Sequence, residues 1–178
     1  MSEAGTLRVL IADDHSPMRL GLAAIISMVP GAQCVGQAVD GEDAVEQYLA
    51  LRPDLMTLDL RMPGLDGLEV IQRVVAAAPE AKILVVTMHD RQDDIVRSLR
   101  AGARGYVLKS APAREIEDAI VTVARGLRYT PPYVADQLAG DQAKVGVGAD
   151  EHIFEAADVT DIIGLGDAAL LADGDAEF

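Results

Sequence analysis

The stretch R-V-L-I-A-D-D-H, from Arg8 to His15, decides the fold class because a short apolar run ends abruptly in two adjacent acids. The run itself covers Leu7–Ala12. Four similar runs follow, each short and rich in Val, Leu or Ile, at Gln33–Ala38, Asp54–Leu58, Lys82–Thr87 and Gly105–Leu108. Such runs are typical of parallel strands buried on both faces, so we predict five strands.

Amphipathic stretches separate and follow these runs, at Met18–Met28, Gly41–Leu51, Leu68–Ala78, Asp93–Ala101 and Ala113–Arg125. Residues that end helices come after the first four of them, namely Pro30-Gly31, Arg52-Pro53, Pro79 and Gly102. Ser16 is predicted to cap the first helix, with Pro17 in its first turn. The alternation indicates right-handed βαβ units, so we predict an α/β fold around a five-stranded parallel sheet.

Length and composition limit the remaining possibilities. The 178 residues suffice for one ordinary domain with some residues to spare, and 3% aromatic content implies an aliphatic core. The apolar run Leu7–Ala12 is too short for a signal peptide or a membrane span, so we expect a cytoplasmic protein that does not engage membranes. The single cysteine, Cys34, and three scattered histidines predict neither a disulfide framework nor a zinc site.

Polar side chains follow four of the five predicted strands. Asp13 and Asp14 come after the first run and Asp59 after the third; Thr87 ends the fourth, and Lys109 follows the fifth. In an open parallel sheet, ligands bind outside the carboxyl ends of the strands, so these five side chains should converge. Taken singly, each has a structural explanation, such as a turn, a helix cap or a solvated lysine. Together they favour a site.

The residue types in this group suit phosphoryl transfer. Three carboxylates form a hard, oxygen-only site that suits Mg²⁺, or alternatively Mn²⁺. A lysine and a hydroxyl beside them could bind the oxygens of a phosphoryl group. One carboxylate could act as the nucleophile and form an aspartyl phosphate.

Four motifs resemble the receiver domains of response regulators, most closely the NarL/FixJ (LuxR-type) group. They are R-V-L-I-A-D-D-H from Arg8, D-L-M-T-L-D-L-R-M-P-G-L-D-G-L from Asp54, V-V-T-M-H-D from Val85, and G-A-R-G-Y-V-L-K from Gly102. The likeness covers residues 7–128. It implies a flavodoxin-like, doubly wound (βα)5 fold with strand order 2-1-3-4-5.

The resemblance also implies a role for each site residue. Asp59 would accept a phosphoryl group from a sensor histidine kinase, and Lys109 would hold the phosphoryl oxygens. Mg²⁺ would be bound by Asp14, Asp59 and the backbone carbonyl of Arg61, with Asp13 assisting through water. Thr87 and the aromatic Tyr106 would form the switch.

The resemblance also suggests which residues tune the phosphoryl lifetime and which surface carries the output. Arg61 and His89 lie where the family tunes phosphoryl lifetime, and either could matter here. The output surface would comprise residues 93–101, the last strand and residues 113–125, acting on a downstream protein partner or in a homodimer. Such a chain is a phospho-accepting switch and not an enzyme.

The family pattern stops after residue 128. We predict a linker at 129–140 and an acidic tail at 141–178, disordered or weakly helical around Glu151–Ile163. The tail holds ten acids against one lysine, Lys144, and lacks the Leu-Thr-x-Arg-Glu opening of the family's DNA-binding domain. Specific DNA binding by this chain is therefore not expected, because a DNA reader needs cations for the phosphates.

Three alternatives stay open at this point. The chain could be a truncated or frameshifted NarL-type transcription regulator, or it could bind promoters directly as related regulators do. It could also be a haloacid-dehalogenase-like phosphatase, which uses an Asp nucleophile, Lys and Mg²⁺ on a parallel sheet. That class places its nucleophile in an Asp-x-Asp pair after the first strand, whereas here the isolated acid, Asp59, follows the third.

Overall fold

A computed structural model describes residues 5–131, and the described residues up to Tyr129 belong to one compact unit. Within these described residues, five parallel strands form one sheet: β1 (Leu7–Ala12), β2 (Ala32–Ala38), β3 (Leu55–Leu58), β4 (Ile83–Thr87) and β5 (Gly105–Leu108). Their spatial order is β2-β1-β3-β4-β5. The predicted flavodoxin-like (βα)5 fold and its strand order are confirmed.

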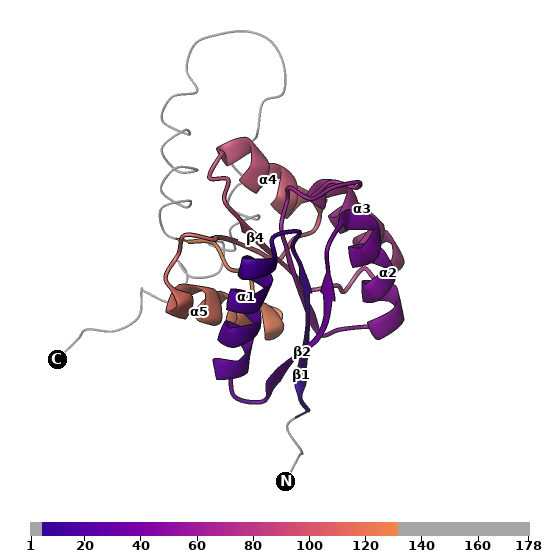
Figure 1. Cartoon of the computed structure of the whole chain (residues 1–178). Helices are drawn as coiled ribbons and strands as arrows, with labels where there is room; N and C mark the ends of the chain where they lie inside the picture. Colours follow the sequence, from indigo (N-terminus) through magenta and orange to yellow (C-terminus); the bar gives the residue numbers. More distant parts are fainter. Residues whose placement is uncertain (1–4, 132–178) are drawn as a thin grey trace, which may run out of the picture. The chain divides into compact units, whose positions relative to one another are not determined.

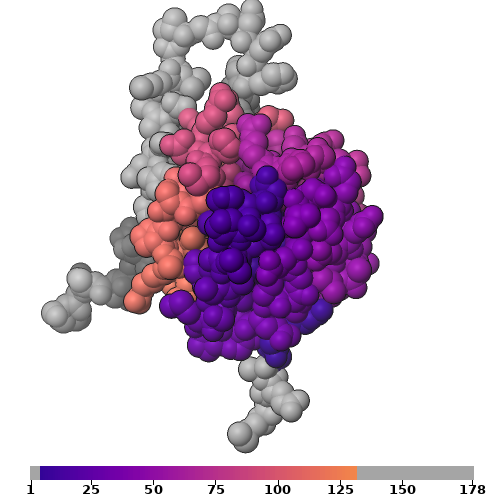
Figure 2. Space-filling view, in the orientation of Figure 1, coloured from indigo at the N-terminus to yellow at the C-terminus, as the bar shows by residue number. Residues whose placement is uncertain are grey.

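Helices cover both faces of the sheet (Figure 1). They are α1 (Ser16–Met28), α2 (Gly41–Leu51), α3 (Gly67–Ala77), α4 (Gln92–Ala101) and α5 (Ala113–Ala124). Helices α1 and α5 pack side by side, whereas α2 contacts α3 and α3 contacts α4. The space-filling view shows the indigo surface of α1 bordered by the orange surface of the α5 region (Figure 2).

The aliphatic core predicted from composition lies against the sheet. One cluster joins β1, β3, β4 and β5 to α1 and α5 through buried Val, Ile, Leu and Ala side chains. Its largest members are fully buried, for example Ile11, Leu84 and Ile120. Burying such side chains stabilises a fold by about 1.5–3 kcal/mol each, so this core is a main source of the stability of the domain.

The predicted cap of the first helix is wrong. Ser16 is the first residue of α1, and His15 is its N-cap, with an extended backbone and no capping hydrogen bond from its side chain. The reason lies two residues upstream, where the Asp13 carboxylate accepts the His15 N–H at 2.8 Å. That bond holds His15 extended and lets the helix begin at Ser16.

Other element boundaries differ from the predictions by one or two residues. Asp54 precedes β3 and uses its carboxylate to accept the Arg8 N–H at 2.8 Å. Lys82 precedes β4 and donates its ammonium to the last turn of α5, at the Ala124 carbonyl, 2.6 Å away. Both side chains make contacts between distant segments, which a local reading of the sequence does not reveal.

Within residues 5–131, no helix is both long and apolar enough to cross a membrane. The predicted acidic tail at 141–178 and most of the predicted linker at 129–140 lie outside the described residues. Both therefore stay predictions.

A buried hydroxyl in β3 gives the first test of the packing. Thr57 is fully buried, and its Oγ1 has no hydrogen-bond partner among the described residues. Burying an unpaired hydroxyl costs free energy, whereas valine has nearly the same shape without it. We expect Thr57→Val to raise the free energy of unfolding by about 1 kcal/mol in urea titrations.

The same change at Thr122, which is half-buried on α5, serves as the control and should leave stability within about 0.5 kcal/mol. A clear loss of stability in Thr57→Val would mean that the hydroxyl has a partner and that this account of β3 is wrong.

Candidate functional site

Backbone hydrogen bonds hold the polar residues at the carboxyl edge of the sheet. The Asp13 N–H donates to the Ala38 carbonyl at 3.1 Å, and the Asp59 N–H donates to the Ala12 carbonyl at 2.9 Å. The Lys109 N–H donates to the Thr87 carbonyl at 2.8 Å. Each bond extends the strand ladder by one residue, so the sheet itself positions the site.

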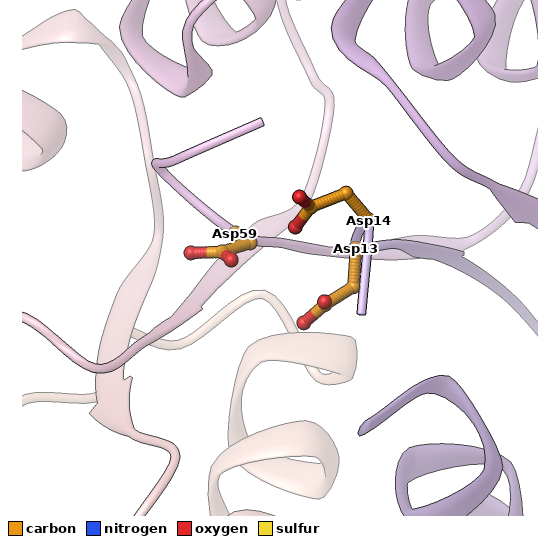
Figure 3. A group of neighbouring side chains, drawn as sticks. All are labelled: Asp13, Asp14 and Asp59. Carbon is orange, nitrogen blue, oxygen red and sulfur yellow. The ribbon is translucent and has the colours of Figure 1, made fainter. Parts of the chain in front are cut away.

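Three carboxylates meet at this edge (Figure 3). Asp13, Asp14 and Asp59 each offer an oxygen, and these oxygens all lie within 4.8 Å of one another. Asp13 and Asp59 are 1% and 6% exposed, while Asp14 is exposed. A cluster of hard oxygen donors, partly buried and open on one side, fits a divalent cation such as Mg²⁺.

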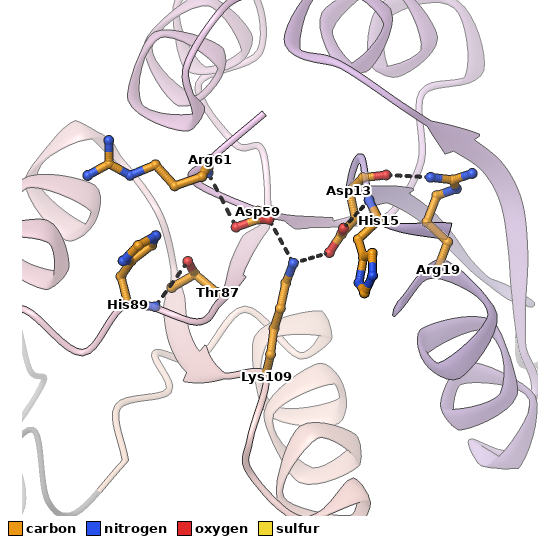
Figure 4. A network of polar contacts seen from close by, with 8 residues as sticks. All are labelled: Asp13, His15, Arg19, Asp59, Arg61, Thr87, His89 and Lys109. Carbon is orange, nitrogen blue, oxygen red and sulfur yellow. Dashed lines mark hydrogen bonds and ion pairs between the residues drawn. The ribbon is translucent and has the colours of Figure 1, made fainter. Parts of the chain in front are cut away.

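Lys109 bridges two of these acids. Its Nζ lies 2.6 Å from Asp13 Oδ2 and 2.7 Å from Asp59 Oδ2, and all three side chains are nearly buried (Figure 4). Burial by itself would lower the pKa of Lys109, but the close contacts with the Asp13 and Asp59 carboxylates outweigh it and raise the pKa above its usual value. Lys109 therefore keeps its charge throughout the neutral pH range.

Thr87 and Tyr106 are linked through the backbone of His89. Thr87 Oγ1 accepts the His89 N–H at 3.4 Å, and the Tyr106 hydroxyl donates to the His89 carbonyl. Thr87 and Tyr106 are both fully buried. The aromatic side chain therefore occupies the inward position, against the loop that follows β4.

The remaining predicted ligand, Arg61, lies beside Asp59. Its backbone N–H donates to Asp59 Oδ1 at 3.3 Å, while its side chain is exposed (Figure 4). The sequence prediction concerns the carbonyl of Arg61, and that role stays a prediction.

Sequence reasoning missed Arg19. Its guanidinium donates from Nη1 to the Asp13 carbonyl at 2.8 Å, which ties α1 to the turn that carries both adjacent acids. No local pattern distinguishes this arginine from a solvated helix residue, because the contact depends on how α1 docks.

Glu42, in the first turn of α2, was also missed. Its carboxylate accepts the Leu65 N–H at 3.2 Å, in the loop that connects Asp59 to α3. A Cβ atom on Gly64 would come within 2.1 Å of Glu42 Oε2, and one on Gly41 within 2.1 Å of the Leu65 carbonyl. These two glycines were the available signal, since glycine often marks a close approach of backbone segments.

Comparison with known proteins identifies the family of this chain. The family model for the response regulator receiver domain matches residues 9–121. Response regulator GacA of Pseudomonas viridiflava is 38% identical over 133 residues, which are 75% of this chain and 62% of GacA. Oxygen regulatory protein NreC of Staphylococcus carnosus is 35% identical over 136 residues, 76% of this chain and 63% of NreC.

Among solved structures, a two-component response regulator of the LuxR family from Aurantimonas sp. SI85-9A1 has a TM-score of 0.75 and 32% identity. The match covers 78% of this chain and 99% of that one. This chain belongs to the response regulator receiver domain family, and its relatives are of the NarL/FixJ type. It spans about 62% of the length of the GacA proteins that it matches.

Membership in the family settles the general class. Receiver domains are regulatory switches of two-component systems; they work with sensor histidine kinases and can form dimers. The family binds Mg²⁺ at an acidic pocket, and this chain has an acidic cluster of Asp13, Asp14 and Asp59. The haloacid-dehalogenase-like phosphatase alternative is therefore set aside.

Proposed function

We propose that this chain accepts a phosphoryl group on Asp59 from a sensor histidine kinase and then controls a partner through the surface of α4, β5 and α5. The observation that carries the proposal is the buried cluster of Asp13, Asp59 and Lys109, joined by contacts of 2.6 and 2.7 Å. Family membership supports the same chemistry.

Each residue has a defined task in this proposal. A carboxylate oxygen of Asp59 attacks the phosphorus, and the bond from phosphorus to the donor's imidazole nitrogen breaks. The Lys109 ammonium has three N–H donors, two of which face Asp13 and Asp59, so a third can bind a phosphoryl oxygen. The Thr87 hydroxyl binds another.

The acidic cluster of Asp13, Asp14 and Asp59 fits Mg²⁺ or Mn²⁺. Asp14, Asp59 and the Arg61 carbonyl would hold the ion, with Asp13 acting through water. When bound, the ion neutralises charge that develops on the phosphoryl oxygens. Without a dication, Lys109 is the cation that balances the two buried carboxylates, Asp13 and Asp59.

The switch follows from the contacts of Thr87. A phosphoryl group that draws the Thr87 hydroxyl toward Asp59 also favours the inward position of Tyr106, because both side chains contact His89. Arg61 and His89, two residues beyond Asp59 and Thr87, would influence how long the phosphoryl group persists. The proposed function does not include DNA binding, because residues 141–178 carry ten acids and one lysine, Lys144, and would repel the DNA phosphates.

Acetyl phosphate labelling tests the proposal. With Mg²⁺ present, the chain should gain one phosphoryl group that hydroxylamine removes, as it does from an acyl phosphate. Borohydride reduction followed by peptide mass spectrometry should place the group on Asp59, and EDTA should prevent labelling. A hydroxylamine-stable label, or a label on another residue, would contradict the proposal.

A further inference from the structure

The outer edge of β5 is occupied by the segment that follows α5, residues 125–129, which we call the exit segment. Strand β5 ends the sheet, so one of its edges faces away from β4. The Tyr106 N–H donates to the Tyr129 carbonyl at 3.1 Å, and the Tyr129 N–H donates to the Arg104 carbonyl at 3.0 Å. Gly105 and Tyr129 thus form an isolated parallel β-bridge at the outer edge of β5.

Local sequence brings the chain to this edge. Helix α5 ends at Ala124, and Gly126 takes a positive φ of 84° that reverses the chain direction. The Gly126 N–H donates to the Val123 carbonyl at 2.9 Å, which closes the helix end. Three residues later Tyr129 meets β5.

The edge is shaped for this contact. A Cβ atom on Gly105 would lie 3.1 Å from the Tyr129 carbonyl and 2.9 Å from Val123 Cγ2, so a larger residue there would push the exit segment away. Tyr129 packs against the hydrophobic core cluster. Burial, together with Glu115 and Asp118 of α5, raises the pKa of its phenol, as expected for a ring held against the domain.

Tyr106 connects this β-bridge to the phosphorylation site. Its backbone binds Tyr129, while its hydroxyl binds the His89 carbonyl, and the N–H of His89 binds Thr87 Oγ1. Only Tyr106 and His89 separate Thr87 from the residue at which the chain leaves the domain.

We propose that the outer edge of β5 is a docking site for Tyr129 and that phosphorylation at Asp59 tightens this docking. The inference rests on the proposed function, because it requires the Thr87 and Tyr106 switch. A phosphoryl group that favours the inward Tyr106 also favours the β5 backbone that binds Tyr129. The signal then leaves the receiver through the exit segment as well as through the surface of α4, β5 and α5.

Coupling of this kind is reciprocal. If phosphorylation tightens docking about fivefold, docking must strengthen binding of a phosphoryl mimic at Asp59 by the same factor, at the low end of usual coupling. Two independent measurements therefore test one quantity.

Amide exchange in the full chain gives the first measurement, with Mg²⁺ and beryllofluoride as the phosphoryl mimic. Protection of the Tyr129 N–H should rise about fivefold when beryllofluoride binds. Unchanged protection at Tyr129, while the amides of Thr87 and Lys109 respond, would show a constitutive edge cover and overturn the inference alone. Failure of the chain to bind beryllofluoride would overturn the proposed function as well.

A pair of variants gives the second measurement. Tyr129→Ala should weaken beryllofluoride binding about fivefold. The substitution removes the aromatic ring that packs against the core and holds the Tyr129 backbone at the edge of β5. Leu127→Ala, in the same exit turn but 59% exposed, is the matched control and should change binding less than twofold. Equal affinity of both variants and the unaltered chain would contradict the coupling. The exchange measurement uses the unaltered chain, so it tests the coupling between phosphorylation and docking even if Tyr129→Ala folds poorly.

Discussion

Asp59→Asn should lose acetyl phosphate labelling by at least about a hundredfold, because the amide oxygen cannot replace the carboxylate nucleophile. The variant should fold normally. Three carboxylate oxygens lie within 4.8 Å of one another, so removing one charge relieves repulsion at the site. Labelling under Mg²⁺ and the unfolding midpoint in urea, measured on the same sample, separate lost chemistry from lost structure.

Asp54→Asn is the matched control for this experiment. Asp54 immediately precedes β3 and Asp59 follows it, so the two acids stand at opposite ends of one strand. The Asp54 carboxylate accepts the Arg8 N–H, a bond that an asparagine oxygen can also accept. Labelling of Asp54→Asn should match that of the unaltered chain. Equal labelling of Asp59→Asn would rule out Asp59 as the acceptor.

Lys109→Met should reduce the free energy of unfolding by about 3 kcal/mol in EDTA, because two nearly buried carboxylates lose their shared cation. Addition of Mg²⁺ should recover part of this loss, since an ion that binds only the folded state stabilises it. Urea titrations at several Mg²⁺ concentrations measure both effects. The same variant should be labelled poorly, because no ammonium then holds the phosphoryl oxygens.

Lys82→Met is the control for charge removal. Lys82 is half-buried and donates to the Ala124 carbonyl, a helix-end contact that contributes about 1 kcal/mol or less. Its loss should not depend on Mg²⁺. If the two variants lose equal stability and neither responds to Mg²⁺, Lys109 does not balance the acidic cluster.

Much of the fold was predictable because its signals are local. Apolar runs of strand length, helix-ending glycines and prolines, and the polar residues Asp13, Asp59, Thr87 and Lys109 after the runs are all visible in short windows. Parallel topology then requires that the carboxyl ends of these strands meet. The convergence of distant residues therefore follows from the sheet.

Contacts that depend on docking angles were not predictable. The bond from Arg19 to the Asp13 carbonyl requires the observed position of α1, and the bond from Leu65 to Glu42 joins residues 23 positions apart. The start of α1 was misplaced for a related reason, since the Asp13 carboxylate competes for the His15 N–H that a local reading leaves unpaired. Single-sequence patterns describe elements better than the side chains that join them.

The extension of the strand ladder into Asp13, Asp59 and Lys109 has a thermodynamic consequence. These backbones are fixed by the same hydrogen bonds that complete the sheet, so folding has already removed most of their conformational entropy. A phosphoryl donor would then meet a preorganised site, and its binding energy would not be consumed in ordering loops. Rapid response to a brief encounter with a donor is what such preorganisation favours.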